Sequence, residues 1–70
     1  MMPLTFAEID EVFVIKRIDL EESEKKRLGD LGFCVGAKIS VVSSRDGDLV
    51  VCIKDSRIAI CKNTAESIII

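Results

Sequence analysis

The side chains that could do chemistry in this 70-residue chain are three cysteines and twelve carboxylates, because the chain contains no histidine. Cys34, Cys52 and Cys61 are odd in number and form no short pairing motif. Without histidine they lack the mixed nitrogen and sulfur ligands that zinc and iron sites commonly use. We therefore expect free thiols, buried or half-buried, in a reducing compartment, and we expect no cofactor or bound metal.

Two carboxylates flank a glycine at Asp46-Gly47-Asp48, a spacing found in cation-binding loops and in hairpin turns. A calcium loop needs about six oxygen ligands, more than this stretch supplies, so we expect a hairpin turn. No nucleophile has a histidine base, and the glycine spacing fits no phosphate-binding loop. The residues therefore predict a protein that is not an enzyme.

Composition indicates a single small domain over residues 1–70 with an aliphatic core. The chain is 49% hydrophobic, yet it has three Phe and no Trp or Tyr, so it lacks the aromatic platform on which bases stack. Its net charge of −2 also disfavours nucleic-acid binding, so a nucleic-acid-binding small barrel is only the weaker alternative. The N-terminus has no signal-peptide pattern and no apolar run is long enough to span a membrane, so we expect a cytoplasmic protein.

The most informative stretch runs from residue 26 to residue 39, where glycines predict two chain reversals. Gly32 follows the last apolar residue of a helical pattern, a position where helices commonly end in a residue with a left-handed backbone conformation. Leu28 and Phe33 then occupy the two positions that pack together in a Schellman motif. Gly36 supplies the positive φ of a type II turn over residues 34–37. The stretch predicts a helix end, a tight turn and the start of a strand.

The helix that precedes this stop is expected to begin at Asp19, with Glu22 three residues later completing a capping pattern. Acidic residues in its first turns and basic residues near its end match the helix dipole. Glu21 with Lys25, and Glu22 with Lys26, are favourable pairs at i,i+4 spacing. Its apolar face is thin, consisting of Leu20, Leu28 and Leu31 only, so we expect an amphipathic helix whose apolar face lies on a sheet.

Alternating apolar residues predict five short strands, at 12–18, 38–44, 49–54, 57–61 and 68–70. The first has apolar residues on both faces and is expected to be covered on both sides, and the last is expected to pair with it. Short helical turns are expected at both ends, one capped by Thr5 with Glu8 and one capped by Asn63 or Thr64. The fold class is therefore mainly β: a small five-stranded barrel with one main α-helix inserted after the first strand.

The motifs Pro3-Leu4-Thr5, Arg27-Leu28…Leu31-Gly32-Phe33…Gly36 and Ile58-Ala59-Ile60…Ala65 resemble the FeoA family over essentially the whole chain. The resemblance implies a small cytosolic SH3-like barrel that serves the bacterial ferrous-iron transporter FeoB as a non-enzymatic accessory. The chain departs from the family pattern at Val35, where proline is common, and at Cys61, where a basic residue is common. A related SH3-like domain occurs in iron-dependent repressors, so one alternative is a module of an iron-dependent regulatory system. A weaker alternative is a carrier that binds Fe²⁺ directly through carboxylates such as Asp46, Asp48, Asp55 and Glu66.

Under this reading the partner is the cytosolic part of an FeoB-like transporter, and the contact residues are Lys26, Arg27, Phe33 and Val35. Basic and aromatic side chains are frequent anchors of interfaces. The alternative for Phe33 is burial against Leu28 as the apolar contact of the Schellman motif. The oligomeric state, and whether the protein activates or inhibits transport, are left open by the sequence.

Overall fold

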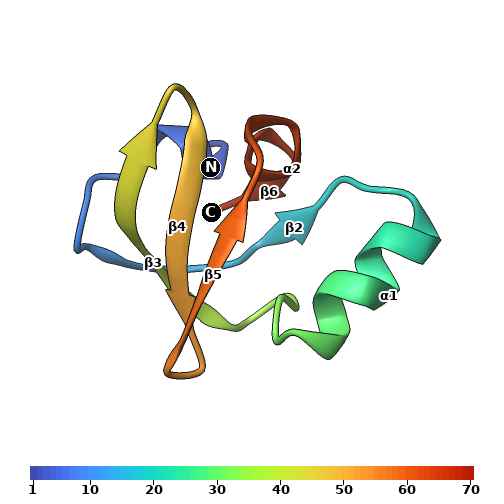
Figure 1. The fold of residues 1–70 in the computed structure, drawn as a ribbon. Coiled ribbons are helices and arrows are strands. Elements are labelled where there is room, and N and C mark those ends of the chain that lie inside the picture. Colours follow the sequence, from blue (N-terminus) through green and yellow to red (C-terminus); the bar gives the residue numbers. More distant parts are fainter.

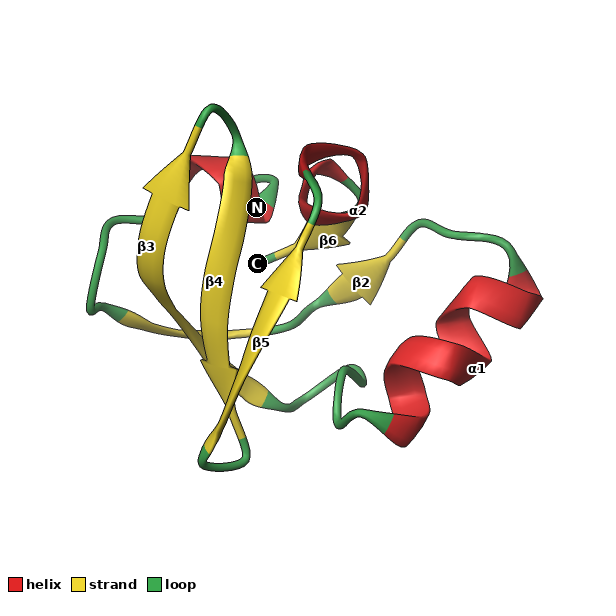
Figure 2. Ribbon diagram, viewed as in Figure 1, coloured by secondary structure: helices red, strands yellow, loops and turns green.

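The strands of the computed structural model, which describes residues 1–70, form two antiparallel sheets around one core (Figure 1). The elements in chain order are a 3₁₀ helix at Leu4–Phe6, β1 at Val12–Val14, β2 at Arg17–Ile18, α1 at Glu22–Asp30, β3 at Lys38–Arg45, β4 at Asp48–Ile53, β5 at Ser56–Ile60, α2 at Lys62–Glu66 and β6 at Ile68–Ile69. One sheet has the order β1-β3-β4-β5, and the other pairs β2 with β6. The longer helix, α1, stands to one side of the strands, and the two termini lie together near β6 (Figure 2).

The predicted first strand, residues 12–18, is divided between the two sheets. The Ile15 N–H donates to the Ala37 carbonyl at 2.9 Å, whereas the next N–H, that of Lys16, donates to the Ile69 carbonyl at 2.8 Å. Consecutive residues therefore bond on opposite sides of the strand, and the chain bends from the four-stranded sheet into the two-stranded one. The predicted pairing of the first and last strands is confirmed, but the count of five strands becomes six.

The prediction that both faces of this first strand are covered is wrong at β1. Val12 and Val14 are 64% and 44% exposed, whereas Phe13 is half-buried and Ile15 is fully buried. β1 is an edge strand, and the core packs against only one of its faces. Although the sequence of this strand is apolar on both faces, one apolar face of β1 is exposed to solvent.

The two hairpins each turn on two residues with positive φ. Asp46 and Gly47, at φ 53° and 91°, connect β3 to β4, which confirms the predicted hairpin turn. Lys54 and Asp55, at φ 48° and 63°, connect β4 to β5. Two central residues at positive φ characterise the type I′ turn, whose twist matches that of the flanking strands. The predicted strands, 49–54 and 57–61, placed this second reversal one residue later, at Asp55-Ser56.

The core draws on every part of the fold, and its six members from β3, β4 and β5 stand at the alternating positions of those strands. No polar or charged side chain is buried. The core residues in the strands or directly next to them are Ile15, Ile18, Ile39, Val41, Leu49, Val51, Ile53, Ile60, Ile68 and Ile70, and the helices and turns add Leu4, Leu28, Phe33 and Ala65. The alternation therefore predicted the buried face of the hairpins correctly.

The end of α1 is the predicted Schellman motif. The Phe33 N–H donates to the Leu28 carbonyl at 2.9 Å, and the Gly32 N–H donates to the Gly29 carbonyl at 3.0 Å. Gly32 has φ 107°, a conformation that a residue with a Cβ atom rarely adopts. Leu28 and Phe33 are each 1% exposed in the core. The predicted type II turn follows, since the Ala37 N–H reaches the Cys34 carbonyl at 3.0 Å and Gly36 has φ 93°.

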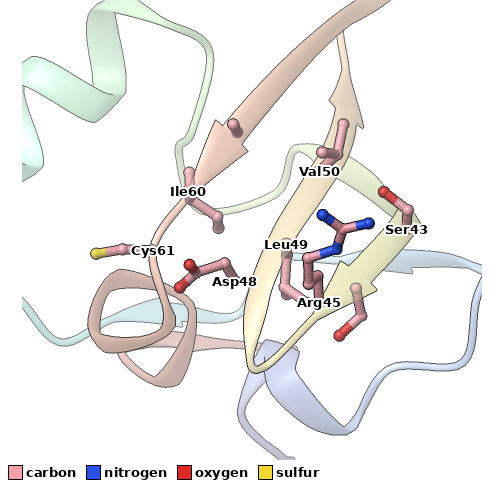
Figure 3. Close-up of a pocket in the computed structure, with 9 residues that line it drawn as sticks. Ser43, Arg45, Asp48, Leu49, Val50, Ile60 and Cys61 are labelled. Carbon is pink, nitrogen blue, oxygen red and sulfur yellow. The ribbon is translucent and has the colours of Figure 1, made fainter.

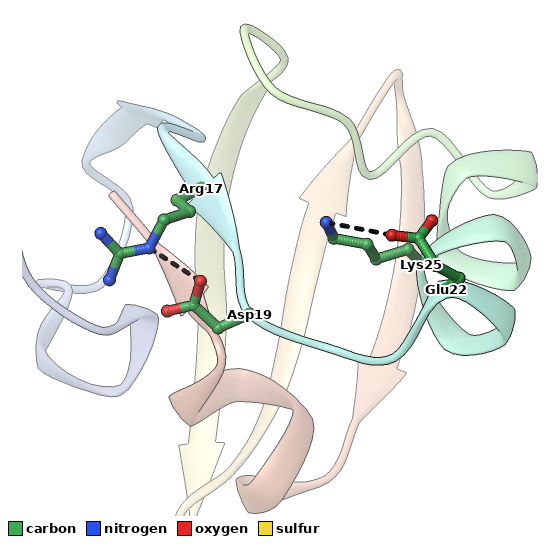
Figure 4. A network of polar contacts seen from close by, with 4 residues as sticks. All are labelled: Arg17, Asp19, Glu22 and Lys25. Atoms are coloured by element: carbon green, nitrogen blue, oxygen red, sulfur yellow. Dashed lines mark hydrogen bonds and ion pairs between the residues drawn. The ribbon is translucent and has the colours of Figure 1, made fainter.

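The start of α1 differs from the prediction. The helix begins at Glu22, and Glu21 precedes it as the N-cap without a side-chain hydrogen bond. Asp19 is not the cap, because its Oδ1 accepts a hydrogen bond from Arg17 Nε at 2.7 Å (Figure 4). The Asp19 N–H also donates to the Ser67 carbonyl at 2.8 Å, so the main chain of Asp19 is still paired at the end of β2 and the helix starts after it.

The ion pairs on α1 also differ from those predicted. Neither expected i,i+4 pair forms, and Lys26 has no ionic partner. The pairs have i,i+3 spacing instead, with Glu22 and Lys25 3.9 Å apart (Figure 4) and Glu24 and Arg27 2.8 Å apart. Because the helix starts later than expected, the first predicted acidic partner lies outside its first turn.

The short helical turns exist at both ends, but their predicted caps are wrong. Thr5 lies inside the 3₁₀ turn, which Pro3 precedes without a side-chain cap. α2 begins at Lys62, earlier than predicted, with Cys61 as the N-cap residue. A residue distant in sequence supplies part of the capping, since Asp48 Oδ1 accepts a hydrogen bond from the Lys62 N–H at 2.9 Å. Neither helix is long and apolar enough to cross a membrane.

Candidate interaction surface

The four side chains expected to contact a partner lie on and just after α1, and three of them reach the surface. Lys26 and Arg27 are exposed, and Val35 is 67% exposed in the turn that follows the helix. Phe33 is buried in the core, as the alternative reading had it, because the Schellman motif directs it inward with Leu28. The expectation that Phe33 anchors a partner is therefore wrong.

The two basic residues differ in their electrostatic environment. Arg27 Nη2 donates to Glu24 Oε2 at 2.8 Å. This hydrogen bond, with the attraction between the two charges, lowers the pKa of the Glu24 carboxyl and raises the pKa of Arg27. Pairs this exposed to solvent contribute little to stability. Lys26 lacks such a neighbour, so its charge is the one most available to a partner.

Leu31 belongs to this surface although sequence reasoning assigned it to the buried face of the helix. It is the C-cap residue of α1 and is 44% exposed. The Schellman motif could have predicted this exposure, because in that motif Leu28 and Phe33 make the apolar contact and the C-cap residue does not. We call the exposed set Lys26, Arg27, Leu31 and Val35 the α1-end surface.

A hollow on strands β3, β4 and β5 is the second surface feature (Figure 3). Its lining residues are Ser43, Ser44, Arg45, Asp48, Leu49, Val50, Ala59, Ile60 and Cys61. Asp48 is already bonded to the Lys62 N–H, and the sulfur of Cys61 points away from the hollow in Figure 3. The hollow therefore presents two opposite charges and no nucleophile with a neighbouring base, which suits binding better than catalysis.

The cysteines are free, as predicted, but their predicted burial is right only for Cys52, which is half-buried. Cys34 begins the type II turn and Cys61 precedes α2, so both are exposed. The Thr64 hydroxyl lies 3.4 Å from Cys61 Sγ. That contact, followed by one from the Thr64 main chain, lowers the pKa of the Cys61 thiol.

The carboxylates and thiols do not gather into a metal centre. No group of three or more Cys, Asp or Glu side chains lies close enough to hold a metal ion. Asp46 sits at a hairpin tip and Asp48 at the start of the next strand. What the structure offers is therefore a set of exposed surfaces on a closed apolar core.

Comparison with known proteins places the chain among proteins of iron transport. A family model described as the FeoA domain matches residues 2–70. The Fe²⁺ transport protein A of Methanocaldococcus jannaschii is 33% identical over all 70 residues, which span 85% of that protein. The solution structure of FeoA from Chlorobium tepidum has a TM-score of 0.88 at 24% identity, covering 97% of this chain and 67% of that one.

A further solved structure identifies the architecture. The FeoA protein of Stenotrophomonas maltophilia, solved with zinc and described as a prokaryotic SH3 domain protein, has a TM-score of 0.81 at 23% identity. The match covers 99% of this chain and 88% of that one. The mainly β, SH3-like barrel predicted for this chain is therefore confirmed.

Proposed function

Because the chain belongs to the FeoA family, whose small SH3-like members take part in ferrous iron transport and are not enzymes, we propose that it is an accessory protein that binds the cytosolic part of an FeoB-like transporter. Such binding locates the protein in the cytoplasm. The observation that carries the proposal is that cationic and apolar side chains are exposed at the end of α1 and in the turn after it, where the helix stands to one side of the strands (Figure 1).

The composition of this surface supports a protein partner. Interfaces combine apolar contact area with arginine anchors and a polar rim. Leu31 and Val35 supply apolar area, and Lys26 and Arg27 supply charge. The barrel itself has little else of this kind to offer near the helix, because its aliphatic side chains are used in the core.

The test is the affinity of the double variant Lys26→Glu, Arg27→Glu for the isolated cytosolic part of the transporter, measured by calorimetry. We expect binding to weaken at least about tenfold, equivalent to about 1.4 kcal/mol, and to lose much of its dependence on salt. The fold should stay intact, because an ion pair as exposed to solvent as Arg27 with Glu24 contributes little to stability.

The matched control is Arg45→Glu, a charge reversal in the hollow on β3, which we expect to bind as the wild type does. Wild-type affinity in the double variant together with weak binding of Arg45→Glu would move the interface to the hollow. No binding by the wild-type chain would reject the transporter as partner. Iron uptake by cells that carry each variant then shows whether the contact activates or inhibits transport.

A further inference from the structure

A second exposed apolar surface lies on the segment from Phe6 to Val12, which leads from the 3₁₀ helix into β1. Phe6 is 70% exposed, and Ile9 and Val12 are 47% and 64% exposed. Phe6 is also the one aromatic side chain that the core leaves in solvent, because Phe33 is buried and Phe13 is half-buried against the core. Large apolar side chains exposed this close together mark an interaction surface.

Main-chain hydrogen bonds hold this segment against the barrel. The Ala7 N–H donates to the Leu4 carbonyl at 2.9 Å, and the Asp10 N–H donates to the Val41 carbonyl of β3 at 2.9 Å. Ile9 also forms a β-bridge with Val41. The backbone of the segment is therefore fixed before a partner arrives, which lowers the entropy cost of binding.

The same segment carries carboxylates and no cation. Glu8, Asp10 and Glu11 are exposed, and none of them forms an ion pair within the chain. No residue from 6 to 12 is lysine or arginine. The segment therefore presents apolar side chains among unpaired negative charges.

The charge of the segment identifies the partner as basic. Partners meet with potentials of opposite sign, so carboxylates that have no cation within the chain fit a partner that supplies lysine or arginine. A lipid surface does not fit, because the cytoplasmic leaflet of a membrane is itself negatively charged. The cytoplasmic loops of membrane proteins do fit, because they carry an excess of lysine and arginine close to the membrane. Tryptophan and tyrosine are enriched at the same boundary and would pack on Phe6.

We propose that the segment from Phe6 to Val12 binds a basic and apolar peptide segment, and that in the transporter this segment is a cytoplasmic loop next to the membrane. The identity of the loop rests on the proposed function, whereas the class of ligand rests on the charge and exposure of the segment alone. Phe6 packs between apolar side chains of the ligand. Glu8 and Glu11 pair with its lysine or arginine side chains.

A titration of the intact chain with a short synthetic peptide of alternating lysine and leucine, followed by amide chemical shifts, tests the class of ligand. We expect the largest changes in residues 6–12, and no binding of the peptide that has glutamate in place of lysine. Glu8→Lys with Glu11→Lys should weaken binding at least about tenfold and remove much of its salt dependence. Phe6→Ala should weaken binding about tenfold with the salt dependence unchanged, because it removes apolar contact and no charge.

The matched control is Glu21→Lys with Glu22→Lys, which makes the same change of charge at two exposed residues where α1 begins. This control should bind the lysine peptide as the wild type does. Shift changes that avoid residues 6–12 overturn the proposal, as does equal weakening of binding in the control. A dimer of the peptide-free chain that Glu8→Lys with Glu11→Lys abolishes in sedimentation also overturns it, since a second copy would then cover the segment.

Binding of the intact chain to the complete transporter in lipid nanodiscs tests the identity of the loop. Glu8→Lys with Glu11→Lys should bind the complete transporter at least about tenfold more weakly than the wild type does, and wild-type affinity overturns the assignment to a loop. No binding by the wild-type chain rejects the proposed function instead. The peptide titration decides the class of ligand in either case.

Discussion

Replacing Gly32 by valine tests the helix stop on which the α1-end surface depends. Gly32 has φ 107°, and its N–H and that of Phe33 close the Schellman motif on the Gly29 and Leu28 carbonyls. Valine is β-branched, so it resists this backbone conformation more strongly than alanine does. If the motif opens, Phe33 loses the turn that places it in the core.

The expected loss is about 2 kcal/mol in the free energy of unfolding. A left-handed conformation costs a residue with a Cβ atom about 1–2 kcal/mol, and β-branching sets valine at the upper end. The new Cβ would lie 3.2 Å from Lys54 Cδ and 3.5 Å from its Cγ. That neighbour is a flexible side chain that moves away at little cost, so backbone strain dominates. For a domain of this size the midpoint of thermal unfolding should fall by about 8–16 °C.

Two other glycines separate backbone strain from packing in the same assay. Gly36 has φ 93° and a Cβ there would meet nothing within 4 Å, so Gly36→Val should show strain alone, about 1–2 kcal/mol. Gly29 is helical and equally unobstructed, so Gly29→Ala should raise stability by about 0.5–1 kcal/mol. The variants are compared by thermal and urea unfolding followed by circular dichroism.

An unchanged midpoint for Gly32→Val would refute the reasoning, because the helix end would then not require a left-handed residue. The same conclusion would follow if Gly29→Ala destabilised the protein as much as Gly32→Val. The changes in stability expected for Gly32→Val and Gly29→Ala have opposite signs although the two positions are three residues apart. This contrast is the most specific consequence of the Schellman motif.

Three further predictions concern the core and the thiols. Leu28→Ala should lower the free energy of unfolding by about 2–5 kcal/mol in a urea titration, because Leu28 is 1% exposed in the core. Replacing Cys34, Cys52 and Cys61 together by serine should leave any binding of Fe²⁺ or Zn²⁺ unchanged in calorimetry, and loss of a micromolar site in that variant would contradict the absence of thiol ligation. Alkylation of Cys61 should have its pH midpoint below that of an unperturbed thiol, since the lowered pKa yields thiolate at lower pH, and Thr64→Val should move that midpoint upward.

The sequence by itself determined the features that depend on a few neighbouring residues. Gly32 and Gly36 required their turns because only glycine adopts their φ angles readily, and the Asp46-Gly47 pair required a tight hairpin. The inward faces of β3, β4 and β5 followed from alternation with period two. These rules operate within a few residues, so they hold wherever the segment lies in the fold.

Only the tertiary structure decided where the first strand breaks and which of its faces stays in solvent. The break arises because Ile15 bonds to Ala37 and Lys16 bonds to Ile69, a residue near the other end of the chain. The exposure of Val12 follows from the edge position of β1, and the later start of α1 accompanies the main-chain hydrogen bond from the Asp19 N–H to the distant Ser67 carbonyl. Such choices depend on hydrogen-bond partners that are distant in sequence or compete locally, and a pattern of residue types does not contain them.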